Sequence, residues 1–594
     1  MDRGTGRHSG LRLQSPAFSS CVRRLYFICG RPFFRGELHM RSGLVAALSI
    51  ALIVCAWSTS SAQQSPSTVS AAEMMSSAVS DQWSMYGHDY SNQRYSRLRQ
   101  INTTNVSKMQ PAWVFQTGVI GPFETTPVVI GDRMYITTAN SHVFSLDART
   151  GTVRWHYQPK LGTVIFCCGN VNRGVAVAGG KVFLGQLDGK LVALNQDTGA
   201  VVWSVQAGDN AAGYSLTMAP LVYKDMVIVG GAGGEYGIRG SVTAYSVNDG
   251  TMKWRTYTVG PGWEGGWSAT TPNGANLHRD LAAEKAADAK YSGTWQNGGG
   301  EVWMTPALDP SMNAIFVTTG NPSPDLDGSQ RPGDNQWTDS VIALDADTGK
   351  VKWAYQEIPH DVWDLDAVSP VVLFTTTVNG EKVPAVGQAG KTAWFYVLDR
   401  RTGKQIRVSE AFDPQENMFA QPTAAGTRML PGANGGDEWS PVSFDPTLGY
   451  AFVATLNQPM WYKTHPAPLT NGALWLGSAF IAIPTEKQDG SVVAINTATG
   501  KLAWTHKVDY PMIGGPASTA GGLTFVGESN GYFDAFNSRT GKLLWHFQTG
   551  AGCNAAPMVY EIGGQEYVAV ASGGSFQINT PYGDALYVFH VPSM

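Results

Sequence analysis

One short phrase recurs along the chain and constrains its fold more than any other feature. It consists of an apolar strand, a polar turn that contains Gly, and a Trp four residues after that Gly. The turn, most often Asp/Asn-x-x-Thr-Gly, predicts a tight connection between antiparallel strands, because Gly accepts the positive φ that such turns need. Six full copies end at Trp155, Trp203, Trp254, Trp353, Trp504 and Trp545, a degenerate copy ends at Arg407, and a looser copy ends at Trp113.

These eight units predict an all-β chain, an eight-bladed β-propeller with tryptophan docking motifs over residues 63–594. A four-stranded sheet cannot bury both of its faces alone, so such units stack radially, with each Trp ring packed between neighbouring sheets. The last unit has strands at 558–560, 567–571 and 585–590 but no Trp phrase, and the Trp113 phrase has no preceding strands. We therefore expect the two ends to complete one blade, which removes free edges. A β-sandwich or an open solenoid is the alternative, and a short helix is expected at residues 281–290.

The composition agrees with a chain rich in strands and turns. Charged residues make up 15% of the sequence, below the ~25% of an average soluble protein, and 68 of 594 residues are Gly. This argues against disorder and long charged helices. The net charge of -4 provides no basic surface for nucleic acid, so we expect no nucleic-acid partner.

The segment before residue 63 indicates export. The apolar run Leu44–Trp57 is too short to span a bilayer comfortably, Arg41 precedes it, and the small residues Ser60 and Ala62 follow it. This pattern is typical of a secretory signal peptide at 40–62, cleaved near Ala62, and it predicts a periplasmic protein without a stable membrane span. An uncleaved anchor is the alternative. Residues 1–39 are interpreted as a misassigned translation start or an extension.

Two adjacent cysteines lie in the segment CCGNVNRG, which contains Cys167, Cys168 and Arg173. Adjacent cysteines can form a strained, functional disulfide, or they can remain as two reduced thiols. Arg173 is a cation suited to a carboxylate.

The motif CC-x-x-x-NRG, preceded by FETTP and set among these Trp phrases, resembles the pyrroloquinoline-quinone (PQQ) alcohol dehydrogenases. This quinoprotein family includes the methanol and ethanol dehydrogenases, and the resemblance runs from about Trp83 to His590. It implies PQQ as the cofactor, with Cys167 and Cys168 as a vicinal disulfide on one face of the quinone and Trp303 on the other. It further implies cofactor contacts from Glu124, Arg173, Thr217, Gly233, Gly234 and Lys391.

The resemblance also implies a metal site formed by Glu235, Asn321 and Asp364. Two carboxylates and an amide form an all-oxygen set that suits a hard cation such as Ca²⁺. Asp366 occupies the position where family members that use lanthanides carry an acid, and a 3+ ion prefers the additional negative charge. Calcium and a lanthanide therefore both remain open. In the alternative interpretation, Asp366 caps a nearby turn or faces solvent, and the ion is Ca²⁺.

The implied reaction is oxidation of a small alcohol to an aldehyde or ketone, with Asp364 as the base and hydride transfer to the quinone. The chain contains no C-x-x-C-H motif, so no c-type haem is attached, and a separate periplasmic cytochrome c is expected to accept the electrons. A homodimer is left open. The competing interpretations are a non-catalytic propeller scaffold of envelope assembly and a dehydrogenase for polyols, sugars or polyvinyl alcohol.

Three positions depart from the family pattern. Glu301 stands where many relatives have Thr, Glu438 stands where many have Asn, and Gly573-Gly574-Ser575 replaces Gly-Trp-Gly. Acids beside a polyanionic cofactor are repulsive unless they are protonated, bound to metal or turned away. These departures leave the branch of the family and the substrate open.

Overall fold

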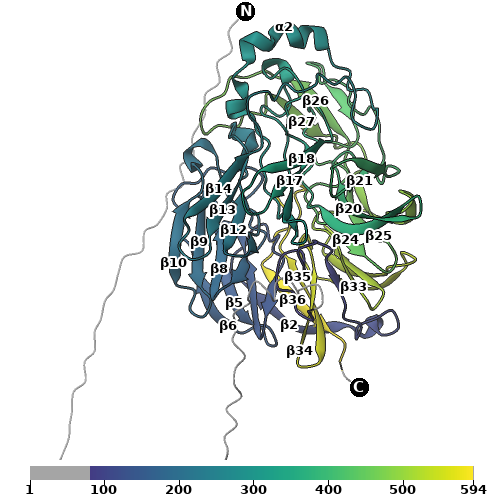
Figure 1. The fold of residues 1–594 in the computed structure, drawn as a ribbon. Coiled ribbons are helices and arrows are strands. Elements are labelled where there is room, and N and C mark those ends of the chain that lie inside the picture. Colours follow the sequence, from purple (N-terminus) through teal and green to yellow (C-terminus); the bar gives the residue numbers. More distant parts are fainter. Residues whose placement is uncertain (1–79, 593–594) are drawn as a thin grey trace, which may run out of the picture. The chain divides into compact units, whose positions relative to one another are not determined.

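The computed structural model describes residues 80–592 (Figure 1). The predictions for residues 1–39 and for the signal peptide at 40–62 lie outside the described residues. Within 80–592 the strands form eight sheets of four or five strands and one sheet of three. The chain is therefore all-β in the part that the structure describes, as predicted.

Five of the sheets are formed by four consecutive strands, each antiparallel to the next. They are β3 (Val128–Ile130), β4 (Arg133–Thr137), β5 (Val143–Asp147) and β6 (Val153–Tyr157); β7 (Ala176–Ala178), β8 (Lys181–Gly185), β9 (Lys190–Asn195) and β10 (Val201–Gln206); β11 (Leu221–Tyr223), β12 (Met226–Gly230), β13 (Ser241–Ser246) and β14 (Met252–Tyr257); β15 (Ala307–Asp309), β16 (Ala314–Thr318), β17 (Ser340–Asp345) and β18 (Val351–Gln356); and β19 (Val372–Val378), β20 (Glu381–Ala389), β21 (Phe395–Asp399) and β22 (Gln405–Val408).

The segment between the repeat glycines 403 and 500 contains an additional sheet. It is the three-stranded sheet β23–β26–β27. Its strands β26 and β27 lie in the sequence between β25 and β28 of the four-stranded sheet β24–β25–β28–β29, and β23 precedes β24. The bounds are β23 (Thr427–Met429), β26 (Met460–Thr464) and β27 (Ser478–Ala482), and β24 (Ser443–Asp445), β25 (Tyr450–Asn457), β28 (Asp489–Asn496) and β29 (Leu502–Val508).

The two ends of the described chain pair in one sheet. Strand β2 near the N-terminal end lies antiparallel to β36, with Gln110 opposite His590, and Figure 1 shows these purple and yellow strands side by side. The prediction that both ends complete one sheet is confirmed. This sheet contains β2 (Gln110–Gln116), β34 (Met558–Ile562), β35 (Gln565–Ser572) and β36 (Ala585–His590). The remaining five-stranded sheet contains β1 (Tyr95–Ser96), β30 (Ala517–Thr519), β31 (Leu523–Gly527), β32 (Tyr532–Asn537) and β33 (Leu543–Gln548).

The recurring tryptophans pack against the turn glycines of the next sheet. Trp155 lies against Gly199, whose φ is +71°, and its indole N–H donates to the Gln196 carbonyl at 3.0 Å. The same contact recurs along the chain. Indole N–H groups of Trp203, Trp353, Trp504 and Trp545 donate to the carbonyls of Val247, Arg400, Ser538 and Met109.

Arg407 takes the place of the tryptophan in the degenerate copy. Its aliphatic part lies against Gly500, and its guanidinium donates to the Thr497 carbonyl at 2.8 Å. A long cationic side chain thus covers the glycine and satisfies the carbonyl as the indole does in the other copies.

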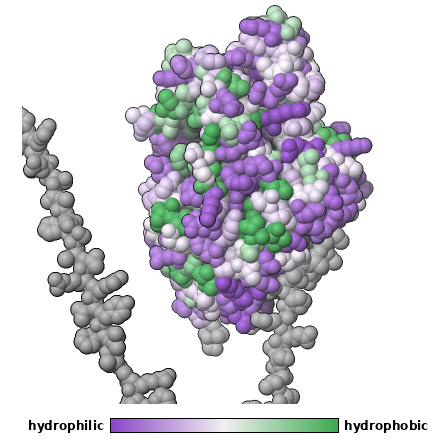
Figure 2. Space-filling view, turned by 90° about the vertical axis from the view of Figure 1, so that its left-hand side faces the viewer, coloured by the Kyte–Doolittle hydropathy of each residue, from purple (hydrophilic) through white to green (hydrophobic). Residues whose placement is uncertain are grey.

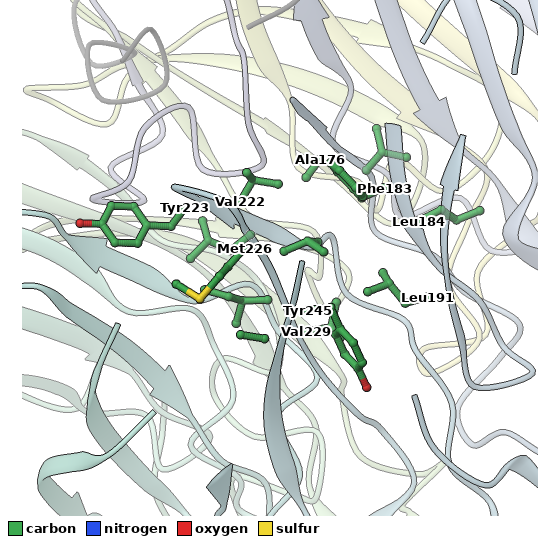
Figure 3. Packing of buried hydrophobic residues seen from close by; sticks show 14 of the residues in the cluster. Ala176, Phe183, Leu184, Leu191, Val222, Tyr223, Met226, Val229 and Tyr245 are labelled. Atoms are coloured by element: carbon green, nitrogen blue, oxygen red, sulfur yellow. The ribbon is translucent and has the colours of Figure 1, made fainter. Parts of the chain in front are cut away.

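The core lies between successive sheets, where their inner strands are buried. Strand β7 contacts β11, β19 contacts β24, and β30 contacts β34. Figure 3 shows the packing between two sheets, with Phe183 and Leu191 from one sheet and Met226 and Tyr245 from the next. The outer strands instead alternate exposed and half-buried residues, and Figure 2 shows the hydrophobic residues of one face in small separate patches among hydrophilic ones.

Helices are short in the described residues. The helix α2 (Leu281–Tyr291) begins after Asp280, whose carboxylate accepts the Ala283 N–H at 3.0 Å, and it confirms the helix predicted at 281–290. No helix within 80–592 is long and apolar enough to cross a membrane. The 3₁₀ helices are η2 (Val106–Lys108), η3 (Ala139–Ser141), η4 (Asn210–Ala212), η5 (Gly234–Tyr236), η6 (Thr294–Asn297) and η7 (Gly328–Gln330).

Candidate active site

The predicted site residues lie in loops at one end of the sheets. Arg173 comes just before β7, Thr217 just before β11 and Trp303 just before β15, whereas Glu235 follows β12 and Lys391 follows β20. Antiparallel pairing places the residues before the first strand of a sheet beside those after its second strand. Loops that are distant in sequence therefore converge on one cavity.

A cavity of about 280 Å³ lies where these loops meet. Of the predicted site residues, three do not line it: Glu124, Gly234 and Asn321. The remaining ten line it together, namely Cys167, Cys168, Arg173, Thr217, Gly233, Glu235, Trp303, Asp364, Asp366 and Lys391.

Cys167 and Cys168 form a disulfide, as predicted. The carboxylate of Glu235 lies next to it, with Oε1 3.8 Å from the Cys168 sulfur. The other thiol of the described chain, Cys553, is buried and free. A covalent sulfur pair therefore lines the cavity beside a carboxylate.

Arg173 is fixed by a buried carboxylate and two aromatic rings. Its guanidinium lies 2.9 Å from Glu124 Oε2, and it lies over the rings of Trp303 and Trp439, 5.0 Å and 4.5 Å from their centroids. Burial raises the pKa of Glu124, and the charge of Arg173 opposes that rise. Ser575, the last residue of the segment Gly573-Gly574-Ser575, donates its hydroxyl to Glu124 at 3.3 Å. Glu124 therefore does not line the cavity itself but holds Arg173, which does.

Several buried polar atoms of the cavity have no hydrogen-bond partner within residues 80–592. These include Thr217 Oγ1, Arg173 Nε and Glu235 Oε2. Buried polar groups are normally paired, so unpaired ones that line a cavity indicate a polar ligand. A planar ligand with carboxylates fits this donor set and the adjacent indole of Trp303.

The loop between β18 and β19 presents two acids to the cavity. The Asp361 carboxylate accepts the N–H groups of Trp363 and Leu365 at 2.9 Å and 2.8 Å, which closes a tight turn. Asp364 within this turn has a φ of +60°. This local geometry lets Asp364 and Asp366 line the same cavity.

Lys391 lies among these acids and is almost completely buried. Its Nζ lies 3.3 Å from Asp364 Oδ1, 3.3 Å from Asp366 Oδ2 and 3.8 Å from Glu438 Oε1. Burial disfavours the ammonium, but Asp364, Asp366 and Glu438 outweigh it and raise the pKa of Lys391. Burial raises the pKa of Asp364 well above its usual range, Lys391 opposes this, and Asp366 adds to it.

Glu235 and Asn321 complete the proposed oxygen donors. Glu235 lies in η5, and burial raises its pKa to about 7, with Asp366 adding to the rise and Lys391 opposing it. Asn321 is buried, and its backbone N–H donates to Asp366 Oδ1 at 2.6 Å. Carboxylate and amide oxygens in a buried site suit a hard cation.

The sequence pattern missed other residues that line the cavity. Met460 of β26 and Phe480 and Ala482 of β27 form a largely apolar wall, and Phe576 lies there with 56% of its surface exposed. They belong to the inserted sheet and to the loop after β35, where no repeat signal exists. The segment 320–337 contributes no residue to the lining.

The sequence matches a known family over more than half of its length. Residues 83–416 and 506–568 match the family described as "PQQ: Glucose/ethanol/alcohol dehydrogenase, beta-propeller domain". The predicted β-propeller fold is thereby confirmed, and the sandwich and solenoid alternatives are excluded.

Individual relatives cover most of the chain. The quinoprotein alcohol dehydrogenase PedH of Pseudomonas putida is 36% identical over 81% of this chain and 84% of that protein. A lanthanide-dependent methanol dehydrogenase of Methylacidiphilum fumariolicum is 35% identical over 83% and 84% of the two chains. The structure of a europium-containing methanol dehydrogenase superposes with a TM-score of 0.78 at 32% identity, covering 87% of this chain and 100% of that chain. The chain belongs to the PQQ-dependent quinoprotein alcohol dehydrogenases, a family of oxidoreductases.

Proposed function

We propose that this protein oxidises alcohols to aldehydes or ketones with PQQ and a metal ion as cofactors. The observation that carries the proposal is the cavity in which a vicinal disulfide, Trp303 and Arg173 lie beside a group of buried acids. A scaffold protein has no need for this combination, and the family membership sets the scaffold alternative aside.

The residues present fit the cofactor. Arg173, Thr217, Gly233, Gly234 and Lys391 would hold PQQ, with Glu124 acting through Arg173, and the disulfide and Trp303 would cover its two faces. The unpaired Thr217 Oγ1 and Arg173 Nε support this assignment. When bound, PQQ supplies a quinone that accepts two electrons.

The proposed metal ligands are Glu235, Asn321, Asp364 and Asp366. Asp366 is 4% exposed and bonded to Asn321, which supports a place within the site and argues against solvent exposure. Three carboxylates favour a trivalent ion, so we propose a lanthanide over Ca²⁺, in line with the names of two of the relatives.

Asp364 is the proposed base for the substrate hydroxyl proton. Its carboxylate lines the cavity and lies 3.3 Å from Lys391 Nζ. The ammonium stabilises the ionised carboxylate against the burial that disfavours it, so that Asp364 can accept a proton. Lys391 therefore positions the base and controls its charge.

The apolar wall favours alcohols over sugars and polyols. Met460, Phe480 and Ala482 offer the substrate no charged group, and an apolar substituent gains from removal from water there. Primary and secondary alcohols with short apolar chains are the proposed substrates.

We propose further that the eight sheets of four or five strands are eight blades, held by the tryptophan–glycine contacts. The signal-like segment before residue 63 supports export to the periplasm. The absence of a C-x-x-C-H motif supports a separate cytochrome c as the electron acceptor.

The test is reconstitution of the purified protein with PQQ and either La³⁺ or Ca²⁺, with an artificial dye as electron acceptor. Reduction of the dye by short alcohols, with La³⁺ more effective than Ca²⁺, is expected. Dye reduction with neither metal across primary, secondary and polymeric alcohols would refute the proposal.

A further inference from the structure

Glu301 is a buried acid of the cavity that the family pattern does not include. It lies two residues before Trp303 and is 1% exposed, and it lines the cavity. Its Oε2 has no hydrogen-bond partner within residues 80–592. A buried carboxylate without partners is costly, so its environment has to supply a compensating charge or proton.

The carboxylate of Glu301 lies against the two glycines that precede two proposed metal ligands. A Cβ on Gly234 would clash with Oε2, and a Cβ on Gly320 would lie 2.8 Å from Oε1. Gly234 precedes Glu235, and Gly320 precedes Asn321. The absence of side chains at these glycines therefore makes room for the Glu301 carboxylate between the two ligand turns.

The backbone fixes this arrangement. Gly320 donates its N–H to the Glu301 carbonyl at 2.8 Å, and Gly300 donates its N–H to the Asn321 carbonyl at 3.0 Å. Glu301 and Asn321 thus belong to two paired segments. Since Asn321 is bonded to Asp366, one hydrogen-bonded unit carries Glu301, Asn321 and Asp366.

The charges near Glu301 are unbalanced. Lys391 pairs with Asp364, Asp366 and Glu438, and no ion pair within residues 80–592 includes Glu301 or Glu235. Glu235, Glu301, Asp364, Asp366 and Glu438 place five carboxylates around the single ammonium of Lys391. A trivalent ion would compensate more of this buried negative charge than a divalent ion would.

We propose that Glu301 is a fifth protein ligand of the metal ion and that its carboxylate makes the site selective for trivalent cations. This inference rests on the proposed function, because it assumes that the site holds a metal. It adds a ligand from the segment before β15 to the four from other loops. It also gives a reason for the acid at a position where relatives carry Thr.

The test compares Glu301→Gln with Glu438→Gln in the full-length protein. Glu438 is a matched control, because it is also a buried acid of the cavity but is bonded to Gln577 at 2.9 Å and lies 3.8 Å from Lys391. Tb³⁺ is the probe, with luminescence sensitised by Trp303, and La³⁺ and Ca²⁺ are competitors. Both variants remove one negative charge, so their difference isolates direct ligation.

The expected result is a loss of Tb³⁺ and La³⁺ affinity in Glu301→Gln of about 100-fold, against at most about fivefold in Glu438→Gln. The loss for Ca²⁺ in Glu301→Gln should be smaller, so that the selectivity for La³⁺ over Ca²⁺ falls. Equal losses in the two variants, or unchanged selectivity, would overturn the inference.

Thermal unfolding supplies a second readout and a check on folding. Without metal, Glu301→Gln should unfold at a higher temperature than wild type, and its stabilisation by La³⁺ should be smaller. If Glu301→Gln does not fold, Glu301→Asp replaces it in the metal titrations. We expect an intermediate loss of La³⁺ affinity in Glu301→Asp, and wild-type affinity would contradict the inference. PQQ binding and dye reduction by wild type are measured in parallel. If the wild type binds metal and PQQ and oxidises alcohols, and Glu301→Gln binds La³⁺ as tightly as the wild type does, the inference alone is refuted. If the wild type binds neither the metal nor PQQ, the proposed function is refuted.

Discussion

The backbone N–H of Asn321 donates to Asp366 Oδ1 at 2.6 Å and joins two loops that belong to different sheets. Asn321 follows β16, and Asp366 precedes β19. The other carboxylate oxygen of Asp366 lies 3.3 Å from Lys391 Nζ. Asp366 is therefore held beside the proposed ligands from two directions, and this argues against the interpretation as a solvent-exposed turn residue.

Replacement of Asp366 by Ser should change the metal preference. The variant loses a carboxylate that favours a 3+ ion, so La³⁺-dependent dye reduction should fall at least about tenfold while Ca²⁺-dependent reduction changes less. Bound La³⁺ and Ca²⁺, measured by mass spectrometry of the desalted protein, should shift in the same direction. An unchanged ratio of the two metals would show that Asp366 does not select the ion.

Replacement of Asp364 by Asn should abolish turnover, because the amide cannot accept the hydroxyl proton. We expect dye reduction to fall at least about 10³-fold, while PQQ absorbance in the desalted protein persists. Asp413→Asn is the matched control, since Asp413 is a buried acid that does not line the cavity. Activity in Asp364→Asn comparable to that control would remove Asp364 as the base.

The disulfide should matter for cofactor binding more than for folding. Cys167 and Cys168 line the cavity and are not buried in the core, so Cys167→Ser/Cys168→Ser should keep the wild-type melting temperature within a few degrees. Its affinity for PQQ should fall about tenfold or more, because the sulfur pair no longer covers one face of the ligand. Titration of PQQ fluorescence measures this. Wild-type affinity in the double variant would rule out a contact with the cofactor.

Sequence reasoning succeeded where a role is set by local chemistry. The spacing of the turn Gly and the Trp predicts the strands and turns of each unit, and the pairing of the adjacent Cys167 and Cys168 needs no long-range information. The spacing does not predict which glycine each Trp contacts, such as Gly199 for Trp155. Glu301 could be noticed only as an unusual residue, because its place between two ligand turns depends on backbone pairing across loops. Phe480 of the inserted sheet gave no signal, because an apolar residue in a strand is equally typical of a core.

The tryptophan contacts provide a matched stability test. Trp504 packs on Gly541 and donates to the Ser538 carbonyl at 3.0 Å, whereas Trp254 packs on Gly349 and its indole nitrogen has no partner within residues 80–592. Both Trp504→Phe and Trp254→Phe lose ring area, but only the former loses a hydrogen bond. We expect Trp504→Phe to lower the free energy of unfolding by about 1 kcal/mol more than Trp254→Phe, measured by urea titration. Equal losses of unfolding free energy in the two variants would show that the Trp504 ring stabilises the fold through packing alone.

Asp413 should make stability depend on pH. It is 4% exposed, accepts the Thr455 hydroxyl at 3.1 Å and leaves Oδ2 without a partner in the described chain. Burial raises its pKa from 3.8 to about 7, and the Thr455 hydrogen bond opposes that rise.

The folded state therefore holds the Asp413 proton more tightly than the unfolded state does, so its contribution to stability is complete below about pH 4 and is lost as the pH rises toward 7. Between pH 5 and pH 8, wild type should lose on the order of 2 kcal/mol relative to Asp413→Asn, measured by urea titration at both pH values. Glu381→Gln, a change at an exposed acid of β20, should track wild type. Parallel pH profiles for wild type and Asp413→Asn would show that Asp413 stays ionised in the folded protein.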